Sequence, residues 1–300
     1  MLNIVENRKI FYAISGIFIA ISIVVIVLWG LQFGIDFKGG SILEINYSER
    51  PDADSISNSL KPLQLNDLRV SPIGSNSIVL RFRETDEETH QSILKTLKDK
   101  ANSTSIGVDE RRFSSIGPTI GAELKQKSIK AIIIVLLGIS FYVAWAFRKV
   151  SQPISSWRYG VVTLIALFHD LIIPIGLFAY LGRFYGVEVG ANFIVALLVI
   201  LGFSVHDTIV VFDRIRENLK RYSQLSFMPL VSQSIRETII RSLNTSLTVL
   251  LTLAALYVFG GESLKYFVLA LMVGIFSGTY SSIFIAAPLL VTWFNFLKRS

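Results

Sequence analysis

The sequence predicts a membrane all-α six-helix bundle with one extracytoplasmic α+β domain of ferredoxin-like β-α-β-β-α-β order. Of the 300 residues, 52% are hydrophobic, and they gather in runs of about 20 residues, the length that crosses a bilayer. After the first run the pattern is interrupted by a polar stretch of roughly 80 residues, which is enough for a small domain with its own core.

The charge distribution narrows the possible partners. The formal net charge is +7, but the cations cluster at the ends of the apolar runs, which favours contact with membrane lipid and excludes nucleic acid. The chain has no cysteine, so disulfides and thiol chemistry are excluded. No phosphate loop, zinc-ligand spacing or nucleophile elbow is present. We therefore expect no cofactor, no metal and no enzymatic activity.

The first span is expected within residues 1–31, where Arg8 and Lys9 precede the apolar run Ile10–Trp29. This run is longer than a signal-peptide core, and no small-residue cleavage site follows it. It is therefore interpreted as an uncleaved transmembrane helix.

Residues 32–119 are predicted to form the extracytoplasmic domain. Alternating apolar residues predict strands, and the spacing of Ile93, Leu94 and Leu97 predicts an amphipathic helix with Thr85 as its N-cap. In order, we expect a strand at Ser41–Tyr47, a helix at Asp54–Leu63 with Asp54 as its N-cap, strands at Asp67–Ser71 and Ser77–Arg83, a helix at Thr85–Ala101 and a strand at Arg111–Ile116.

Residues 120–300 are predicted to hold five further spans, at about 128–147, 161–181, 191–212, 243–259 and 266–296. The charged segment Asp213–Arg241 is interpreted as a cytoplasmic loop with a surface helix. On one side of the membrane, the short loops hold only Arg183 and Lys265 as basic residues. The positive-inside rule therefore predicts cytoplasmic N- and C-termini and an outer domain.

The fourth span carries two polar residues, His206 and Asp207, within apolar sequence. An ionised carboxylate near the bilayer centre costs about 2.5–3.5 kcal/mol, so such residues usually serve ions, protons or a buried partner. Asp213 and Arg214 mark the expected cytoplasmic interface, about 9 Å along the helix axis from Asp207. Proton coupling is the favoured role of Asp207, and a packing role satisfied by a neighbouring helix is the alternative.

The fifth span carries a polar stripe at helical spacing, which we expect to face into the bundle. Arg241 begins the stripe at a depth from which it could contact Asp207. The alternatives are interhelical hydrogen bonding without transport and, for Arg241, an interfacial position. The members of the stripe are Arg241, Asn244, Thr245, Thr248 and Thr252.

The third span contains a second polar pair, His169 and Asp170. Pro174, four residues later, cannot donate a hydrogen bond to the carbonyl of residue 170, so a kinked or hydrated helix is expected there. A proton path and a structural polar contact both remain open for this pair. In the sixth span, small residues recur every fourth position and predict a packing surface against another helix bundle; they are Ala270, Gly274, Gly278 and Ser282.

Four segments resemble the SecF family, the smaller subunits of the SecD–SecF accessory complex of bacterial protein export within the resistance–nodulation–division superfamily. They are GIDFKGG at Gly34–Gly40, which includes Asp36, Gly39 and Gly40; GPTIGAEL at Gly117–Leu124; HDTIVVFDRIREN at His206–Asn218, which includes Asp213 and Arg214; and FGGESL at Phe259–Leu264. The resemblance covers nearly the whole chain. His206 departs from the asparagine that many members carry.

The resemblance implies a partnership with SecD, the SecYEG channel, SecA and an unfolded preprotein client in the bacterial cytoplasmic (inner) membrane. It implies use of the proton motive force for late steps of preprotein export. The family's functional carboxylate and arginine match Asp207 and Arg241, and His206 adjoins them. Two alternatives remain: a proton-driven half-transporter for a small molecule or lipid, and a non-conducting assembly subunit.

Overall fold

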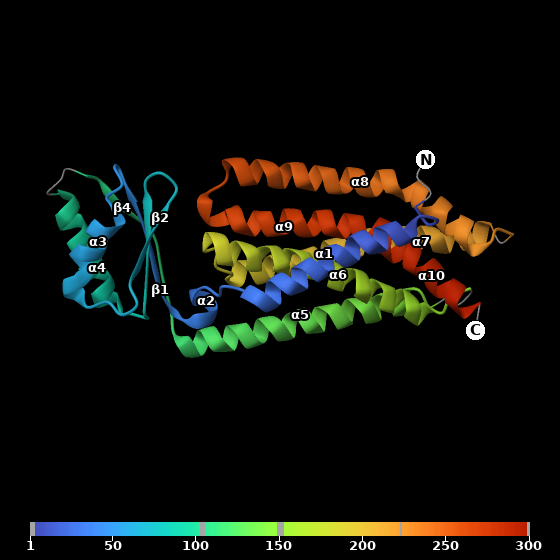
Figure 1. Cartoon of the computed structure of the whole chain (residues 1–300), viewed down its shortest axis with the longest axis horizontal. Coiled ribbons are helices and arrows are strands. Elements are labelled where there is room, and N and C mark those ends of the chain that lie inside the picture. Colours follow the sequence, from blue (N-terminus) through green and yellow to red (C-terminus); the bar gives the residue numbers. More distant parts are fainter. Residues whose placement is uncertain (1–3, 103–105, 149–152, 223, 299–300) are drawn as a thin grey trace. The chain divides into compact units, whose positions relative to one another are not determined.

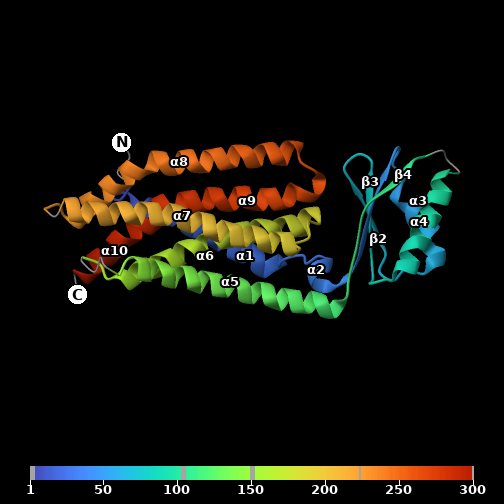
Figure 2. The same cartoon turned by 180° about the vertical axis from the view of Figure 1, so that it is seen from behind.

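The computed structural model describes residues 4–102, 106–148, 153–222 and 224–298. It divides into two compact units, one of Phe33–Ile129 and one that joins residues 1–32 to Lys130–Ser300. Figures 1 and 2 show the first as a sheet with helices and the second as a set of long helices. The domain boundary expected after residue 119 falls inside one continuous helix, α5 (Pro118–Ala146), because the expected juxtamembrane helix and the second span are a single element.

The unit of Phe33–Ile129 is built on an antiparallel sheet of four strands in the order β2-β3-β1-β4. The predicted β-α-β-β-α-β order is confirmed, with one short helix in front of it. The elements are α2 (Ile35–Lys38), β1 (Gly40–Tyr47), α3 (Ala53–Leu60), the 3₁₀ turn Lys61–Leu63, β2 (Arg69–Ile73), β3 (Ser77–Phe82), α4 (Glu87–Asn102) and β4 (Val108–Ile116).

The core of this unit lies between the sheet and the helices α3 and α4. Leu43, Ile45 and Tyr47 alternate along β1 and are all buried in one cluster with the apolar sides of both helices. Such alternation is what a strand with one covered face requires.

Both helices of this unit begin differently from the sequence expectation. Asp52, not Asp54, caps α3 by accepting a hydrogen bond from the backbone N–H of Asp54 at 3.2 Å. Asp86, not Thr85, caps α4 by accepting from the N–H of Thr89 at 2.9 Å. This N–H holds the pKa of the Asp86 carboxyl below its ordinary value. Both expected caps were wrong because another aspartate lies close by: Asp52 is two residues before Asp54, and Asp86 follows Thr85 and is the better N-cap residue type.

The second unit contains helices that are long and apolar enough to cross a membrane, and with α5 they number six in the described chain. The chain is thus a multi-pass membrane protein. The remaining five are α1 (Arg8–Trp29), α6 (Ser156–Tyr185), α7 (Ala191–Arg221), α8 (Phe227–Phe259) and α9 (Glu262–Ser281), which continues through a π-helical turn (Ser282–Ala286) into α10 (Ala287–Leu297).

The helices α6, α7 and α9 form the interior of this unit, whereas α1, α5 and α8 expose most of their surface. The segment expected as a cytoplasmic loop with a surface helix is mostly helical, because α7 continues to Arg221 and α8 already begins at Phe227. The expected packing surface on the sixth span is present, but it contacts α7 within this chain. A Cβ atom added at Gly278 would lie 2.9 Å from the Cβ of Ser204, so glycine allows the two helices to approach closely.

Candidate functional site in the helix bundle

Asp207 lies on the inner face of α7 and is 2% exposed. The buried residues Ser204, Thr208 and Val211 share this face at helical spacing, and the face contacts α8 and α9. Asp207 is therefore held inside the bundle, between its own helix and α8 and α9.

The hydrogen bonding of Asp207 is sparse for a buried carboxylate. Ser246 Oγ on α8 lies 3.3 Å from Asp207 Oδ2 and 2.6 Å from Thr279 Oγ1 on α9. The Thr279 hydroxyl donates to the carbonyl of Ile275 at 2.9 Å. The Ser246 hydroxyl thus gives Asp207 one long hydrogen bond and is at the same time hydrogen-bonded to Thr279.

His206 is the nearest titratable neighbour of Asp207. Its Nδ1 lies 3.7 Å from Asp207 Oδ1, and its side chain is 61% exposed whereas that of Asp207 is 2% exposed. An exposed imidazole thus adjoins a buried carboxylate. This arrangement gives Asp207 a titratable group on its accessible side.

Arg241 does not contact Asp207 in the part of the chain that the structure describes. Its side chain is exposed, and the expected Asp207–Arg241 contact is therefore wrong for this chain taken alone. The reason is the rotation of α8: the face that turns inward carries Ser242 and Ser246, which are small and buried. Arg241 precedes this face by one residue, or about 100° around the helix.

The rest of the expected polar stripe shares the exposed position of Arg241, so the expectation that it points into the bundle is also wrong. Asn244, Thr248 and Thr252 are exposed and Thr245 is half-buried. The threonine hydroxyls donate to carbonyls of their own helix, as in Thr248 to Thr245 at 2.8 Å and Thr252 to Thr248 at 3.0 Å. A polar face on a membrane-spanning helix is thus left uncovered by this chain.

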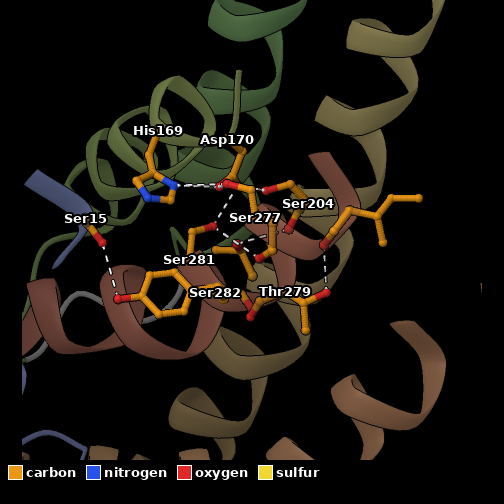
Figure 3. A network of polar contacts seen from close by, with 12 residues as sticks. Ser15, His169, Asp170, Ser204, Ser277, Thr279, Ser281 and Ser282 are labelled. Atoms are coloured by element: carbon orange, nitrogen blue, oxygen red, sulfur yellow. Dashed lines mark hydrogen bonds and ion pairs between the residues drawn. The ribbon is translucent and has the colours of Figure 1, made fainter. Parts of the chain in front are cut away.

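Asp170 lies on α6 and is completely buried. Figure 3 shows hydrogen bonds that converge on its carboxylate from three helices. On Oδ1, His169 Nδ1 lies at 2.8 Å and the Ser277 hydroxyl donates at 3.1 Å. On Oδ2, the hydroxyls of Ser204 and Ser281 donate at 2.5 and 2.7 Å.

The sequence did not single out these serines, although a signal was present. Ser277 and Ser281 on α9 are four residues apart, as are Ser242 and Ser246 on α8. Small hydroxyl residues at this spacing share a helix face and favour hydrogen bonds between membrane helices. Among the described residues, no cluster of three or more histidine, aspartate or glutamate side chains could hold a metal ion.

Asp213 and Arg214 lie near the end of α7 that joins α8. Arg214 donates to Glu237 of α8 at 2.5 Å and to Glu217 at 2.6 Å, and Asp213 pairs with Arg216 on its own helix. Asn218 also donates to Glu237, at 3.0 Å. The end of the HDTIVVFDRIREN segment thus ties α7 to α8.

Gly39 of the GIDFKGG segment contacts the GPTIGAEL segment inside the unit of Phe33–Ile129. Gly39 and Gly40 both have positive φ, at 77° and 122°. An added Cβ at Gly39 would lie 2.7 Å from Pro118 Cα, and one at Gly121 would lie 2.9 Å from Gly39 N. Asp36 lies in the first turn of α2, and this short helix ends immediately before the two glycines. Only glycine fits the left-handed backbone and the close approach at position 39.

Comparison with known proteins agrees with this arrangement. Residues 96–295 match the family described as "Protein export membrane protein SecD/SecF, C-terminal", and residues 30–49 match the "SecD/SecF GG Motif". The chain belongs to the SecD/SecF family. The GG motif includes Gly39, which lies against Pro118 and Gly121, and Gly40, which lies against the backbone of Phe82, so this family feature has a packing role here.

Relatives of similar length carry the name "Protein translocase subunit SecF". That of Thermobaculum terrenum is 44% identical over 98% of this chain and 95% of the relative, and that of Anaerolinea thermophila is 41% identical over 98% and 94%. A crystal structure of SecDF from Thermus thermophilus, described as a translocon-associated membrane protein, is similar with 30% identity and a TM-score of 0.81. The match covers 98% of this chain but only 39% of that longer chain.

Proposed function

We propose that the chain is the SecF subunit of a SecD–SecF complex that uses the proton motive force to promote late steps of preprotein export across the cytoplasmic membrane. In this proposal Asp207 is the group that gains and loses the proton. The SecYEG channel, SecA and the unfolded preprotein are the expected partners, and the sheet-containing unit lies on the outer side, with both termini in the cytoplasm.

The observation that carries the proposal is the sparse hydrogen bonding of buried Asp207. An ionised carboxylate at this position accepts one long hydrogen bond from Ser246, at 3.3 Å, whereas a neutral carboxylic acid can donate its own hydrogen to Ser246 Oγ. Protonation therefore changes the contact between α7 and α8. Moving one elementary charge across the membrane potential is worth about 2.3 kcal/mol per 100 mV, which is enough to shift a conformational equilibrium.

The uncovered polar face of α8 supports a partner within the membrane. Arg241, Asn244, Thr248 and Thr252 are exposed on a helix that crosses the bilayer. Charged and amide groups facing lipid are costly, so such a face is expected to lie against another membrane protein. The match covers only 39% of the similar SecDF chain, whose name joins SecD and SecF. SecD is therefore the natural candidate for this partner. Arg241 would then lie at the interface between this chain and SecD.

The test is preprotein export into inverted membrane vesicles that contain the SecD–SecF complex with Asp207→Asn. Because asparagine cannot exchange a proton, we expect an assembled complex that has lost the part of export that depends on the proton gradient. Asp109→Asn, which removes an exposed carboxylate from β4, is the control and should leave export unchanged.

Co-purification of the two subunits separates this proposal from the assembly alternative. If Asp207→Asn abolishes the association with SecD, Asp207 serves assembly and the non-conducting alternative is favoured. If the complex assembles and its gradient-dependent export is normal, Asp207 is not the coupling group and the proposal is wrong. Gradient-driven efflux of a small molecule or lipid by the wild-type complex would favour the half-transporter.

A further inference from the structure

Asp170 and Asp207 are both buried, but they differ in their hydrogen bonding and in the histidine beside them, which is buried at Asp170 and exposed at Asp207. Each of the two Asp170 oxygens accepts two hydrogen bonds, from His169 and Ser277 on Oδ1 and from Ser204 and Ser281 on Oδ2. A carboxylate has about four acceptor positions, so all of them are filled. The side chain is 0% exposed.

The four donors connect the three interior helices of the bundle. His169 comes from α6, Ser204 from α7, and Ser277 and Ser281 from α9. The distances of 2.5 and 2.7 Å to Oδ2 are in the range of strong charge-assisted hydrogen bonds. The carboxylate also leaves no space between itself and the hydroxyls for a cation, because each hydroxyl is already in direct contact with it.

The same two partner helices carry the Asp207 site. On α7, Ser204 precedes Asp207 by three residues, about one helical turn. On α9, Thr279 contacts Ser246 beside Asp207 and lies between Ser277 and Ser281. The hydrogen bonds to Asp170 therefore fix the segments of α7 and α9 that surround Asp207, whereas α8 is attached there through Ser246 at 3.3 Å.

The backbone around this cluster shows why such a fixed point is needed. Pro174 interrupts the hydrogen bonding of α6 one turn after Asp170. The π-helical turn of α9 begins at Ser282, immediately after Ser281. Proline removes one backbone hydrogen bond of the helix, and π-helical turns are frequent at functional sites.

We infer that Asp170 is a positioning residue, which accepts hydrogen bonds throughout the transport cycle and holds α6, α7 and α9 together as the support for Asp207. The inference rests on the proposed function of Asp207. It assigns the two carboxylates different roles: Asp207 exchanges the proton, and Asp170 keeps its surroundings in register.

The test compares Asp170→Asn, Asp170→Ala and the double variant Ser204→Ala/Ser281→Ala in the SecD–SecF complex, with gradient-dependent export into inverted vesicles as the readout. Asparagine keeps an acceptor for His169 and Ser277, and its amide can donate to the hydroxyls of Ser204 and Ser281. We therefore expect Asp170→Asn to retain export within about twofold. Asp170→Ala and the double serine variant leave buried polar groups unpaired and should lose about tenfold or more.

Ser282→Ala is the matched control. Ser282 is buried on the same helix, but its hydroxyl donates to the carbonyl of Thr279 and not to Asp170. Its replacement should leave export unchanged, whereas a general intolerance of α9 to loss of a hydroxyl would reduce export in both variants.

Two outcomes would overturn the inference. If Asp170→Asn loses export as completely as Asp170→Ala, the carboxylate must change its protonation during the cycle and is not a fixed acceptor. If the double serine variant behaves like Ser282→Ala, the hydrogen bonds to Asp170 do not position the site. If Asp170→Ala fails to assemble with SecD, the inference is tested by comparing Asp170→Asn with Ser204→Ala/Ser281→Ala.

Asp207→Asn measured in parallel separates the inference from the proposed function. If Asp207→Asn loses gradient-dependent export and Asp170→Asn keeps it, the proposed function of Asp207 and the positioning role of Asp170 are both supported. If Asp207→Asn keeps export, the proposed function fails by itself, whatever the Asp170 variants do.

Discussion

Replacing Gly278 by alanine should separate α7 from α9 at the point where Ser204 reaches Asp170. The added Cβ would lie 2.9 Å from Ser204 Cβ, 3.2 Å from its Cα and 3.3 Å from its Oγ. Ordinary contact between carbon atoms is about 3.5–4.0 Å, so the helices must move apart by roughly 0.5–1 Å. The Ser204 Oγ to Asp170 Oδ2 distance of 2.5 Å would then increase.

The size of the effect follows from three contributions. Overpacking of a close contact costs about 1–3 kcal/mol, and weakening a hydrogen bond to a charged group costs up to about 1.5–3 kcal/mol. Alanine recovers about 1 kcal/mol through its higher helix propensity. With the hydrogen bond lost, these contributions add up to a decrease of about 1.5–5 kcal/mol in the free energy of unfolding of the complex for Gly278→Ala.

The assay is thermal unfolding of the purified SecD–SecF complex in detergent, with Gly202→Ala as the matched control. Gly202 lies on α7, two residues from Ser204, and an added Cβ there meets nothing within 4 Å. Gly202→Ala should therefore unfold at the wild-type midpoint or slightly above it. If Gly278→Ala unfolds no earlier than Gly202→Ala, the contact between α7 and α9 is not as close as described.

A second variant tests whether the two positions act on each other. Ser204→Gly removes most of the atoms that the new methyl group would meet, and it also removes the donor to Asp170. Gly278→Ala/Ser204→Gly should therefore be more stable than the sum of the two single changes, and the difference measures the coupling of the two positions through both the steric contact and the hydrogen bond. Additive effects would show that the two positions do not contact each other.

Two further predictions concern the other unit and the uncovered face of α8. Burial raises the pKa of the Tyr47 hydroxyl to about 12, above the ordinary value of about 10. The unfolded chain therefore loses this proton at a lower pH than the folded chain. The contribution of Tyr47 to the free energy of unfolding should be fully present below about pH 10 and be lost as the pH rises through about 12. Tyr47→Phe should remove this component from the pH dependence of thermal unfolding, and an unchanged dependence would contradict it. The chain lacks cysteine, so a single introduced cysteine can be cross-linked selectively. Thr248→Cys should form cross-links to SecD, whereas the control Ile134→Cys, which replaces an exposed apolar residue of α5, should not. Equal cross-linking of the two variants would argue against the α8 face as the interface.

The sequence was sufficient to predict the helices and the strand order because these depend on local patterns. Apolar run length located the six spans, and alternation located β1. Helix ends were harder to predict. The charged segment after Asp213 is of the kind that commonly forms loops, yet contacts such as Arg214 to Glu237 pair α7 with α8 beyond the apolar runs and keep both helical.

The candidate site shows a different limit. The spacing of Arg241, Asn244 and Thr248 correctly placed them on one helix face, but periodicity does not tell which face turns inward. The inward face of α8 is set by Ser246, which lies between Asp207 and Thr279. Ser246 is 39 positions from Asp207 and 33 positions from Thr279 in the sequence. For Asp170, the sequence left a proton path and a structural polar contact open, and its donors at positions 277 and 281 are too distant in sequence for any local pattern to connect them.

The wide sequence separation of these partners also has a consequence for how the protein is made. Asp170 precedes its donor Ser204 by 34 residues and Ser281 by 111 residues. At about 5–20 residues per second, roughly 6–22 s pass between the synthesis of Asp170 and that of Ser281. During this interval α6 carries a carboxylate with few of its final partners, and the insertion of α9 completes its hydrogen bonding. The last span thus supplies the final hydrogen bonds of Asp170, so a chain truncated before α9 should be retained by the insertion machinery or degraded.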